Sequence, residues 1–544
     1  MSNQTSQEHS TTTARSSALV SSRRGLFKAL GLGASVVALK GVETLSSVAR
    51  AETDHVPANP LPSSTPLPDG LNPAHFTMHS RSPLTLESKR HLVGTSVITS
   101  KEHLFVRNNL PMPDEAVLED RDAWRVEFEG ARQSKSLSLR ELKGLGLETV
   151  AMVLQCSGNG RAFYTHGPSG SKWATGAAGC VVWSGVPVRD VVKALGGVDT
   201  EARYMTSTGG DPLPQGLDPL SVIIERSVPL QKGLEDALLA WEMNGAPIPL
   251  THGGPVRMIV PGYFGCNQIK YVKRVAFTKQ QTKAKIQHTG YRYRPIGVKG
   301  SPDQPSMWSM PVKSWLVNEP ALPEGRQVLR GVALGGERAV KRVEVSVDGG
   351  KRWREAKLIG PDLGRFAWRL FTLTVELPRG EHVLVSRAYD DKGEVQVEEG
   401  GDNERGYGHT GWADHALKVM VDDQAADDLY RAQADERRPL PKATVTPSAG
   451  GHPAPASAPV TLSAEAREGR EVFLNKSAPQ CGVCHTLEDA GTKGVVGPNL
   501  NELKPDEAQV LSAIKQGIGA MPPQTTLSEG QLKALAKYVF EATR

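Results

Sequence analysis

The sequence predicts a multidomain protein made of an α/β domain, a β-sandwich and a small all-α domain. The α/β domain is predicted from short β-rich runs that alternate with helical segments over 84–298. The sandwich is predicted from alternating strands separated by turns over 299–420, and the all-α domain from helical patterning over 461–544. A chain of 544 residues has room for about three or four such domains.

The composition is that of an ordinary globular protein. The hydrophobic fraction is 39% and the charged fraction is 23%. The net charge of +5 is spread along the chain without a concentrated basic stripe, so nucleic-acid binding is not expected. The five cysteines are too few for a disulfide scaffold.

The N-terminal residues have the form of an export signal. A twin-arginine segment, Ser22–Lys28, precedes an apolar run, Leu30–Leu39, and a small-x-small site at Ala49–Ala51. The run is too short to span a bilayer, and a short amphipathic helix is the alternative interpretation. We expect residues 1–51 to be a signal peptide, and therefore a periplasmic protein without a membrane span. Residues 52–83, rich in proline and polar residues, are expected to be extended.

Within 84–298, Trp124–Glu129 and Val150–Leu154 have the composition of strands. Val188–Leu195 and Leu234–Met243 are predicted to be helices.

Within 299–420, valines at 343, 345 and 347 alternate with charged residues, and Asp348-Gly349-Gly350 follows as a hairpin turn. Apolar residues alternate again over 371–377, and 382–389 is a further strand. This pattern predicts an immunoglobulin-like β-sandwich. Residues 421–460 are charged and then rich in Pro, Ala, Ser and Gly, which predicts a linker.

The last helix of the chain is predicted from its start signal. Ser528 and Gln531 have the spacing of a capping box. Leu532, Leu535 and Val539 then recur on one face of the helix.

The most specific motif is Cys481-Gly-Val-Cys484-His485, the attachment signature of c-type haem. Its two thiols would bind one haem covalently, and His485 would ligate the iron. A redox or zinc Cys-x-x-Cys is the alternative, but the export signal and the following Gly497–Leu500 segment favour haem. Met521, in a proline-rich loop, is the expected second axial ligand, with a core methionine as the alternative. Because a closed, six-coordinate haem favours electron transfer, the larger domain must supply the electrons.

A second candidate metal ligand is Cys156. It stands at the end of an apolar strand and enters a Gly-rich turn, Ser157–Arg161. This position can present the sulfur to a cavity. On this stretch alone, an inert core thiol is an equally good interpretation.

Several separated motifs occur in one order and together resemble the sulfite oxidase family of molybdenum enzymes. The resemblance covers residues 84–420 and is carried by Leu104–Pro111, Val153–Arg161, Val182–Val186, Trp241–Pro249, His252–Arg257, Val260–Gly262, Lys270, Gly290-Tyr291 and Asn403–Tyr407. It implies a molybdopterin-binding catalytic domain over 84–298 and a dimerisation domain over 299–420, so we expect a homodimer.

The resemblance also implies roles for individual residues. Cys156 would be the thiolate ligand of molybdenum, a soft donor suited to a transition metal. Arg107, Arg161 and Arg405 would form a cationic pocket, and guanidinium groups suit small oxyanions. Tyr291 would be the active-site tyrosine, with the nearby Tyr293 as a rival assignment. The resemblance further implies a pocket-lining role for Trp183.

The cofactor-binding residues implied by the resemblance are Phe105, Asn109, His252, Arg257 and Lys270, which would hold molybdopterin and its phosphate. Asn109 is a departure, because many family members have His there. Cys180 and Cys266 match no family role and are expected to be buried thiols, with a mutual disulfide as the alternative.

The expected function is periplasmic oxidation of sulfite to sulfate, with electrons passed through the fused haem to an external acceptor such as a soluble cytochrome c. A sulfur dehydrogenase acting on protein-bound sulfur is the nearest alternative. Nitrate reduction is a third reading. The remaining alternative is an electron carrier with a non-catalytic large domain.

Overall fold

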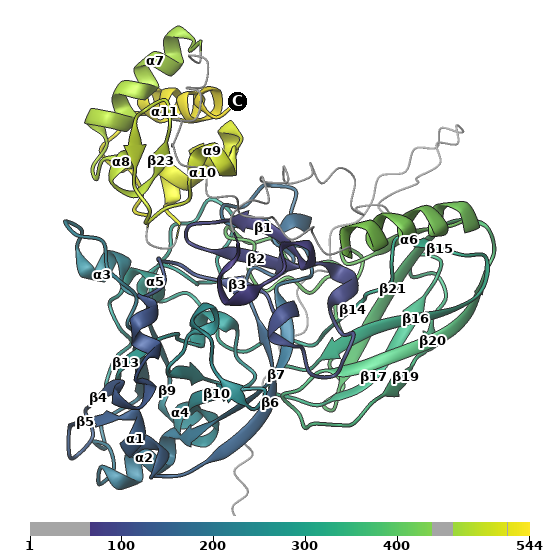
Figure 1. The fold of residues 1–544 in the computed structure, drawn as a ribbon, viewed down its shortest axis with the longest axis horizontal. Coiled ribbons are helices and arrows are strands. Elements are labelled where there is room, and N and C mark those ends of the chain that lie inside the picture. Colours follow the sequence, from purple (N-terminus) through teal and green to yellow (C-terminus); the bar gives the residue numbers. More distant parts are fainter. Residues whose placement is uncertain (1–65, 438–460, 519–520) are drawn as a thin grey trace, which may run out of the picture. The chain divides into compact units, whose positions relative to one another are not determined.

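The computed structural model describes residues 66–437, 461–518 and 521–544 (Figure 1). The expected signal peptide, the start of the expected extended segment and residues 438–460 lie outside the described residues. None of the helices in the described part of the chain has both the length and the apolar character needed to cross a membrane.

A small three-stranded sheet begins before the expected start of the catalytic domain. Its strands are β1 (Phe76–Ser80), β2 (Thr85–Ser88) and β3 (Val106–Arg107), in the order β1-β2-β3. The described part of the segment expected to be extended contains two short 3-10 turns, Pro68–Gly70 and Pro73–His75, before strand β1, so the expectation is wrong at these turns. The physical reason is apolar burial, since Phe76 packs with Leu84 and Leu86 in one cluster.

Two five-stranded sheets form the α/β domain. The first has the order β11-β10-β7-β6, with β12 also paired to β10, and the second has the order β5-β4-β13-β8-β9. The strands are β4 (Arg125–Glu129), β5 (Lys135–Ser138), β6 (Glu148–Gln155), β7 (Ala178–Pro187), β8 (Tyr204–Gly209), β9 (Glu225–Pro229), β10 (Leu238–Met243), β11 (Ala246–Pro247), β12 (Arg257–Ile259) and β13 (Val272–Thr278). The helices are α1 (Leu139–Lys143), α2 (Val188–Ala194), α3 (Pro219–Val222), α4 (Leu230–Asp236) and α5 (Lys285–His288).

The structure confirms the two strands and the first helix predicted for this domain, but the helix predicted over 234–243 is wrong. Helix α4 ends at Asp236, and Leu238–Met243 is the central strand β10. This strand lies between β7 and β12, where its apolar residues are buried on both faces. A continuous apolar run of this kind cannot be distinguished from a buried helix by periodicity alone.

The predicted β-sandwich consists of two sheets that enclose one apolar core. The alternating valines of β17 point into this core, as expected. The immunoglobulin-like topology stays a prediction. One sheet contains β14 (Lys313–Leu316), β16 (Gly325–Leu334), β20 (Arg369–Leu377) and β19 (Lys357–Ile359); the other contains β15 (Ala321–Leu322), β22 (Leu417–Val421), β21 (Gly380–Asp390), β17 (Val340–Ser346) and β18 (Arg354–Glu355).

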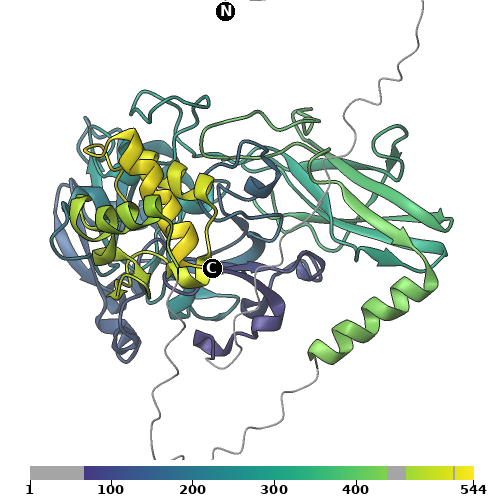
Figure 2. The ribbon, with the colours of Figure 1, turned by 90° about the horizontal axis from the view of Figure 1, so that it is seen from above.

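The expected linker from residue 421 is wrong at its beginning. Residues Asp423–Arg437 form helix α6, which contacts β15 and β22 (Figures 1 and 2). The segment contains no proline or glycine and is rich in alanine and straight-chain residues, which favour a helix. Asp422 starts the helix by accepting a hydrogen bond from the backbone nitrogen of Ala425 at 3.0 Å.

The C-terminal domain is helical, as predicted (Figure 2). The capping box of Ser528 and Gln531 is present, and Leu532, Leu535 and Val539 are buried. Gly469 allows α7 to approach α11 closely, because a Cβ there would lie 1.9 Å from the backbone oxygen of Ala534. The helices are α7 (Ala464–Glu471), α8 (Cys481–Cys484), α9 (Leu500–Leu503), α10 (Glu507–Gln516) and α11 (Glu529–Ala542), with a hairpin of β23 (Thr486–Leu487) and β24 (Thr492–Lys493).

Candidate functional site

Cys156 lies in a tight turn directly after β6. Its backbone nitrogen donates to Ala177, and its carbonyl accepts from Asn159 at 3.0 Å, which fixes the turn. Gly158 is required here, because a Cβ would lie 2.5 Å from the guanidinium of Arg161. The turn thus folds Arg161 back over the backbone near Cys156, and Cys156 lines a cavity.

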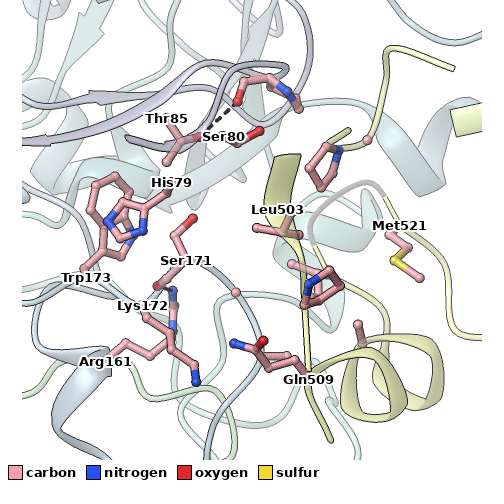
Figure 3. A pocket seen from close by; sticks show the side chains of 18 of the residues that line it. His79, Ser80, Thr85, Arg161, Ser171, Lys172, Trp173, Leu503, Gln509 and Met521 are labelled. Atoms are coloured by element: carbon pink, nitrogen blue, oxygen red, sulfur yellow. Dashed lines mark hydrogen bonds between the residues drawn. The ribbon is translucent and has the colours of Figure 1, made fainter. Parts of the chain in front are cut away.

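The cavity has a volume of about 1300 Å³ and brings together most of the predicted site residues (Figure 3). Those from the catalytic part of the chain are Cys156, Arg107, Arg161, Arg405, Tyr291 and Asn109. In Figure 3, Arg161, Lys172 and Trp173 lie on one side and Leu503, Gln509 and Met521 on the other. The cavity therefore joins the predicted metal ligand Cys156 to the C-terminal domain.

The three predicted pocket arginines are held by neutral groups. Arg161 donates from Nε to the carbonyl of Arg405 at 2.9 Å and from Nη1 to that of Ser171 at 2.8 Å. Arg107 donates from Nη2 to Oδ1 of Asn109 at 2.8 Å. Among the described residues, no carboxylate forms an ion pair with Arg107, Arg161 or Arg405. Their combined positive charge is therefore available to an anion in the cavity.

Burial also shifts the pKa of Arg161. It lowers this pKa below its ordinary value, while Tyr407 and Cys156 oppose the shift and Arg405 adds to it. An arginine still stays protonated at neutral pH. A buried cation without a carboxylate partner is costly, so a bound oxyanion would relieve that cost.

The structure separates the two rival tyrosines. Tyr291 lines the cavity, whereas Tyr293 is 40% exposed and is not among the lining residues. Tyr291 has a positive φ of 42°, which is strained for a residue with a side chain, and its ring stacks on Tyr407 at 5.1 Å. Burial raises the pKa of its phenol, with the charge of Arg107 opposing. Tyr291 is therefore a protonated hydrogen-bond donor at neutral pH.

A second group of predicted residues lies outside the lining of this cavity and contains His252, Arg257, Lys270 and Trp183. Arg257 donates to the carbonyl of His252 at 2.8 Å, and its guanidinium lies 5.2 Å from the ring centroid of Trp183. Lys270 donates to Oδ1 of Asn108 at 2.7 Å. Strand β3 and the residue after it link the two groups, because Arg107 faces the cavity and Asn108 meets Lys270.

The second group has buried donors without acceptors. His252 Nε2, Arg257 Nε and Trp183 Nε1 are buried and lack a hydrogen-bond partner. Burial lowers the pKa values of His252 and Lys270 well below their ordinary values and that of Arg257 to about 10. Orphaned donors beside basic groups fit a polar, phosphate-bearing cofactor. Phe105 is buried nearby in the core, with its ring edge-on to Trp173 at 6.1 Å.

The haem motif faces the same cavity. The cavity is lined there by Cys481, Cys484, His485 and Met521, together with the apolar residues Phe473, Leu500, Ile514, Leu535 and Val539. His485 Nδ1 lies 2.9 Å from the carbonyl of Pro498, which leaves Nε2 for iron. Burial lowers the pKa of His485, which favours the neutral, ligating form. This donor set and the apolar lining fit a haem.

Among the described residues, three hydrogen bonds and one ion pair connect the two sides of the cavity, and two of the hydrogen bonds are made to the backbone at Gly517 and Met521. Arg405 Nη1 donates to the carbonyl of Gly517 at 2.7 Å, and Lys285 Nζ donates to that of Met521. The others are Ser82 to the carbonyl of Val495 at 2.9 Å and Lys172 with Asp506 at 4.0 Å. A predicted substrate arginine thus also touches the C-terminal domain.

Sequence reasoning overlooked two cavity residues. Tyr407, which stacks on Tyr291, lies two residues after Arg405 in a motif that was already recognisable. No sequence motif marked Lys285, because a lone lysine in a polar segment is ordinary. Burial and the charge of Arg405 lower its pKa to about 8. Cys180 and Cys266 are free thiols, as expected, and the alternative disulfide between them is wrong.

Comparisons with known domains agree with this geometry. Residues 110–286 match the oxidoreductase molybdopterin binding domain, and residues 306–422 match the Mo-co oxidoreductase dimerisation domain. Residues 464–539 match the domain of the cbb3-type cytochrome c oxidase subunit III.

Curated relatives match about three fifths of the chain, which in turn spans about three fifths of the human protein. Mitochondrial sulfite oxidase of Homo sapiens is 34% identical over 346 residues, which cover 59% of this chain and 61% of the human protein. Sulfite oxidase of Gallus gallus is 33% identical over 350 residues, 60% of this chain and 74% of the chicken protein. The sulfane dehydrogenase SoxCD from Paracoccus pantotrophus shares the fold, with 24% identity, a TM-score of 0.53, and coverage of 63% of this chain and 88% of that one. The chain belongs to the sulfite oxidase family of molybdopterin oxidoreductases and carries a cytochrome c domain at its C-terminal end.

Proposed function

We propose that the chain oxidises sulfite to sulfate and passes the electrons through a single, covalently bound haem c to an external acceptor such as a soluble cytochrome c. The net reaction combines sulfite and water and yields sulfate, two electrons and two protons. The observation that carries the proposal is one cavity that contains Cys156, three arginines without carboxylate partners and the haem ligands. A site of this composition attracts a small oxyanion and lies beside an electron outlet.

The substrate is held by Arg107, Arg161 and Arg405. Each guanidinium keeps donors beyond those bonded to protein carbonyls, and their fixed planes suit the oxygens of a small anion. The protonated phenol of Tyr291 adds a neutral donor. The arginines also offset negative charge that accumulates as oxygen is transferred.

The cofactor is proposed to be a molybdenum–molybdopterin centre held by Cys156 through its sulfur and by His252, Arg257 and Lys270 through the pterin and phosphate. When bound, this group supplies the oxygen atom and accepts two electrons. Asn109 is proposed to face the pterin, while it orients Arg107. Phe105 and Trp183 are proposed to pack around Cys156 and support it, because both are buried in one apolar cluster with it.

The electron outlet is proposed to be the haem attached to Cys481 and Cys484, with His485 and Met521 as axial ligands. Methionine/histidine ligation raises the reduction potential and suits electron acceptance. Arg405 and Lys285 hold the loop around Met521 at the cavity, so this loop lies next to the substrate arginines. Electrons then have a route from the pocket to the haem across the same cavity.

The cellular context is proposed from the sequence. The twin-arginine segment indicates periplasmic export of the folded protein with its cofactor. The match to a dimerisation domain supports a homodimer formed through the β-sandwich.

Metal analysis and a sulfite assay test the proposal together. We expect about one molybdenum and one iron per chain, and sulfite-dependent reduction first of the bound haem and then of added cytochrome c. Iron without molybdenum would favour an electron carrier. Both metals without sulfite turnover would favour another sulfur substrate, such as the protein-bound sulfur of a sulfur dehydrogenase, and would overturn the sulfite assignment.

A further inference from the structure

A buried arginine outside the cavity lies against the ring of Tyr291. Arg226, on strand β9, is 1% exposed and is not among the residues that line the cavity. Its guanidinium lies 5.5 Å from the ring centroid of Tyr291. A cation over an aromatic face at this distance attracts the ring, and the attraction is stronger away from water.

The guanidinium of Arg226 is fixed in place by neutral acceptors. It donates from Nη1 to the carbonyl of Ile286 at 3.1 Å and from Nη2 to Ser306 Oγ at 2.9 Å. It also donates from Nη2 to Oδ1 of Asn267 at 3.1 Å. Among the described residues no carboxylate pairs with Arg226, so these neutral acceptors and the face of the Tyr291 ring compensate its charge.

A second route connects Arg226 to the backbone of Tyr291. Asn267, which accepts from Arg226, donates from Nδ2 to the carbonyl of Met307 at 2.8 Å. The backbone nitrogen of Met307 in turn donates to the carbonyl of Tyr291 at 2.9 Å. Arg226 therefore constrains both the ring and the main chain of Tyr291.

This constraint acts on a strained residue. The positive φ of Tyr291 is unfavourable for a residue with a side chain and persists only where the surroundings enforce it. The ring of Tyr291 also stacks on Tyr407, whose own ring lies 5.3 Å from the guanidinium of Arg161. Contacts between rings and guanidiniums thus connect Arg226, which does not line the cavity, to Arg161, which does.

We propose that Arg226 is a positioning residue that holds Tyr291 in its strained conformation, so that the phenol points at the anion bound in the cavity. Arg226 itself touches no substrate. The proposal rests on the proposed role of Tyr291 in the pocket. It assigns the orientation of that phenol to a buried cation that lies against the Tyr291 ring and does not line the cavity.

A double-mutant cycle with Tyr291→Phe tests this role. In Arg226→Met the fold-decrease in kcat should be about ten times the fold-increase in KM. The molybdenum and haem contents should be unchanged. In the Tyr291→Phe background the same substitution should cost less than about twofold, because the hydroxyl that Arg226 orients is already gone. Arg226→Lys keeps the charge without the planar fork and should restore part of the rate.

Arg292→Gln is the matched control. Arg292 is equally buried and donates to Gln287, Gln304 and Gln281, whereas the guanidinium that lies against the Tyr291 ring is that of Arg226. Its effect should be the same in both backgrounds. Equal losses for Arg226→Met in both backgrounds would mean a general structural role and would overturn the proposal.

Crystal structures of the variants provide a readout that needs no turnover. In Arg226→Met, or in Arg226→Lys where the methionine variant does not fold, the Tyr291 ring should leave the Tyr407 stack and φ should relax to a negative value. An unmoved Tyr291 in both variants would refute the inference. Absence of sulfite turnover in the wild type would refute the proposed function and leave this structural comparison to decide the role of Arg226.

Discussion

Arg405 Nη1 lies 2.7 Å from the carbonyl oxygen of Gly517, so one guanidinium lines the predicted anion pocket and also binds the haem domain. A hydrogen bond from a charged donor contributes about 1.5–3 kcal/mol. The proposed substrate binding and the proposed electron exit therefore share one side chain.

Replacement of Arg405 should affect both steps. In Arg405→Met we expect the KM for sulfite to rise about tenfold or more, because one cation of the pocket is lost. We also expect slower internal electron transfer to the haem, measured by stopped-flow reduction with sulfite. Arg352→Met is the control, since Arg352 is an exposed arginine that pairs with Asp348 and does not line the cavity, and it should change either rate less than about twofold. A normal haem reduction rate in Arg405→Met would contradict the coupling.

Replacement of Cys156 should separate the two metal centres. Cys156→Ser replaces a soft thiolate donor with a hard hydroxyl, so sulfite turnover should be lost while the visible haem spectrum stays that of the wild type. Cys180→Ala is the control, because Cys180 is wholly buried away from the cavity and its pKa is raised to about 12 by burial. Retained turnover in Cys156→Ser would exclude Cys156 as the ligand.

Replacement of Gly497 should disturb the haem alone. A Cβ at this position would lie 2.4 Å from Cε1 of His485, so the imidazole must shift. In Gly497→Ala we expect an altered visible spectrum and slower haem reduction, with molybdenum content unchanged. Gly530→Ala is the control, because a Cβ there meets only Ser528 Oγ at 4.0 Å, and alanine favours the helix. Identical spectra for both variants would argue against His485 as the axial ligand.

Buried Lys313 predicts a pH dependence of stability. Its ammonium donates to the carbonyl of Asn159 at 3.3 Å, and burial lowers its pKa to about 7. In the unfolded chain its pKa is 10.5, so between about pH 7 and 10.5 the unfolded state binds the extra proton and stability rises with pH. At and below pH 7 the full penalty of the buried group is present. The neighbouring His409 and His415 have lowered pKa values and titrate below this window.

The variant Lys313→Met should remove that dependence. Its Tm should exceed the wild-type Tm by the largest margin near pH 6.5, and the margin should shrink toward pH 9.5, as measured by thermal denaturation. Lys537→Met, on the exposed pair with Glu507, should leave the pH slope unchanged. Parallel curves for wild type and Lys313→Met would show that Lys313 does not titrate in this range.

The parts of the fold that follow from local chemistry were predictable. The capping box at Ser528, the alternating valines of β17 and helix α2 depend on residues close in sequence. Strand β10 was not predictable, because its apolar run is compatible with a helix. Only the folded structure shows that β7 and β12 flank it. Helix α6 was missed because the Pro/Ala-rich composition farther on dominated the interpretation of the whole segment.

The candidate site also has residues that the sequence predicts and residues that only the folded structure reveals. Cys156, Arg161 and the haem motif stand in short, recognisable segments. The choice between Tyr291 and Tyr293 depended on which side chain the chain turns inward at a positive φ, which sequence does not reveal. The contacts of Arg226 with Asn267 and Ser306 join segments far apart in the chain, so only the folded structure shows them.

Because the pocket arginines lack acidic partners among the described residues, other small anions in solution should affect the proposed reaction. Guanidinium groups recognise charge and oxygen geometry, and sulfate, the product, matches both as well as sulfite does. Sulfate and phosphate should therefore act as competitive inhibitors, and rising ionic strength should weaken all three anions alike. The working rate of the protein would then follow the ratio of sulfite to total small dianions in its surroundings, and not the sulfite concentration alone.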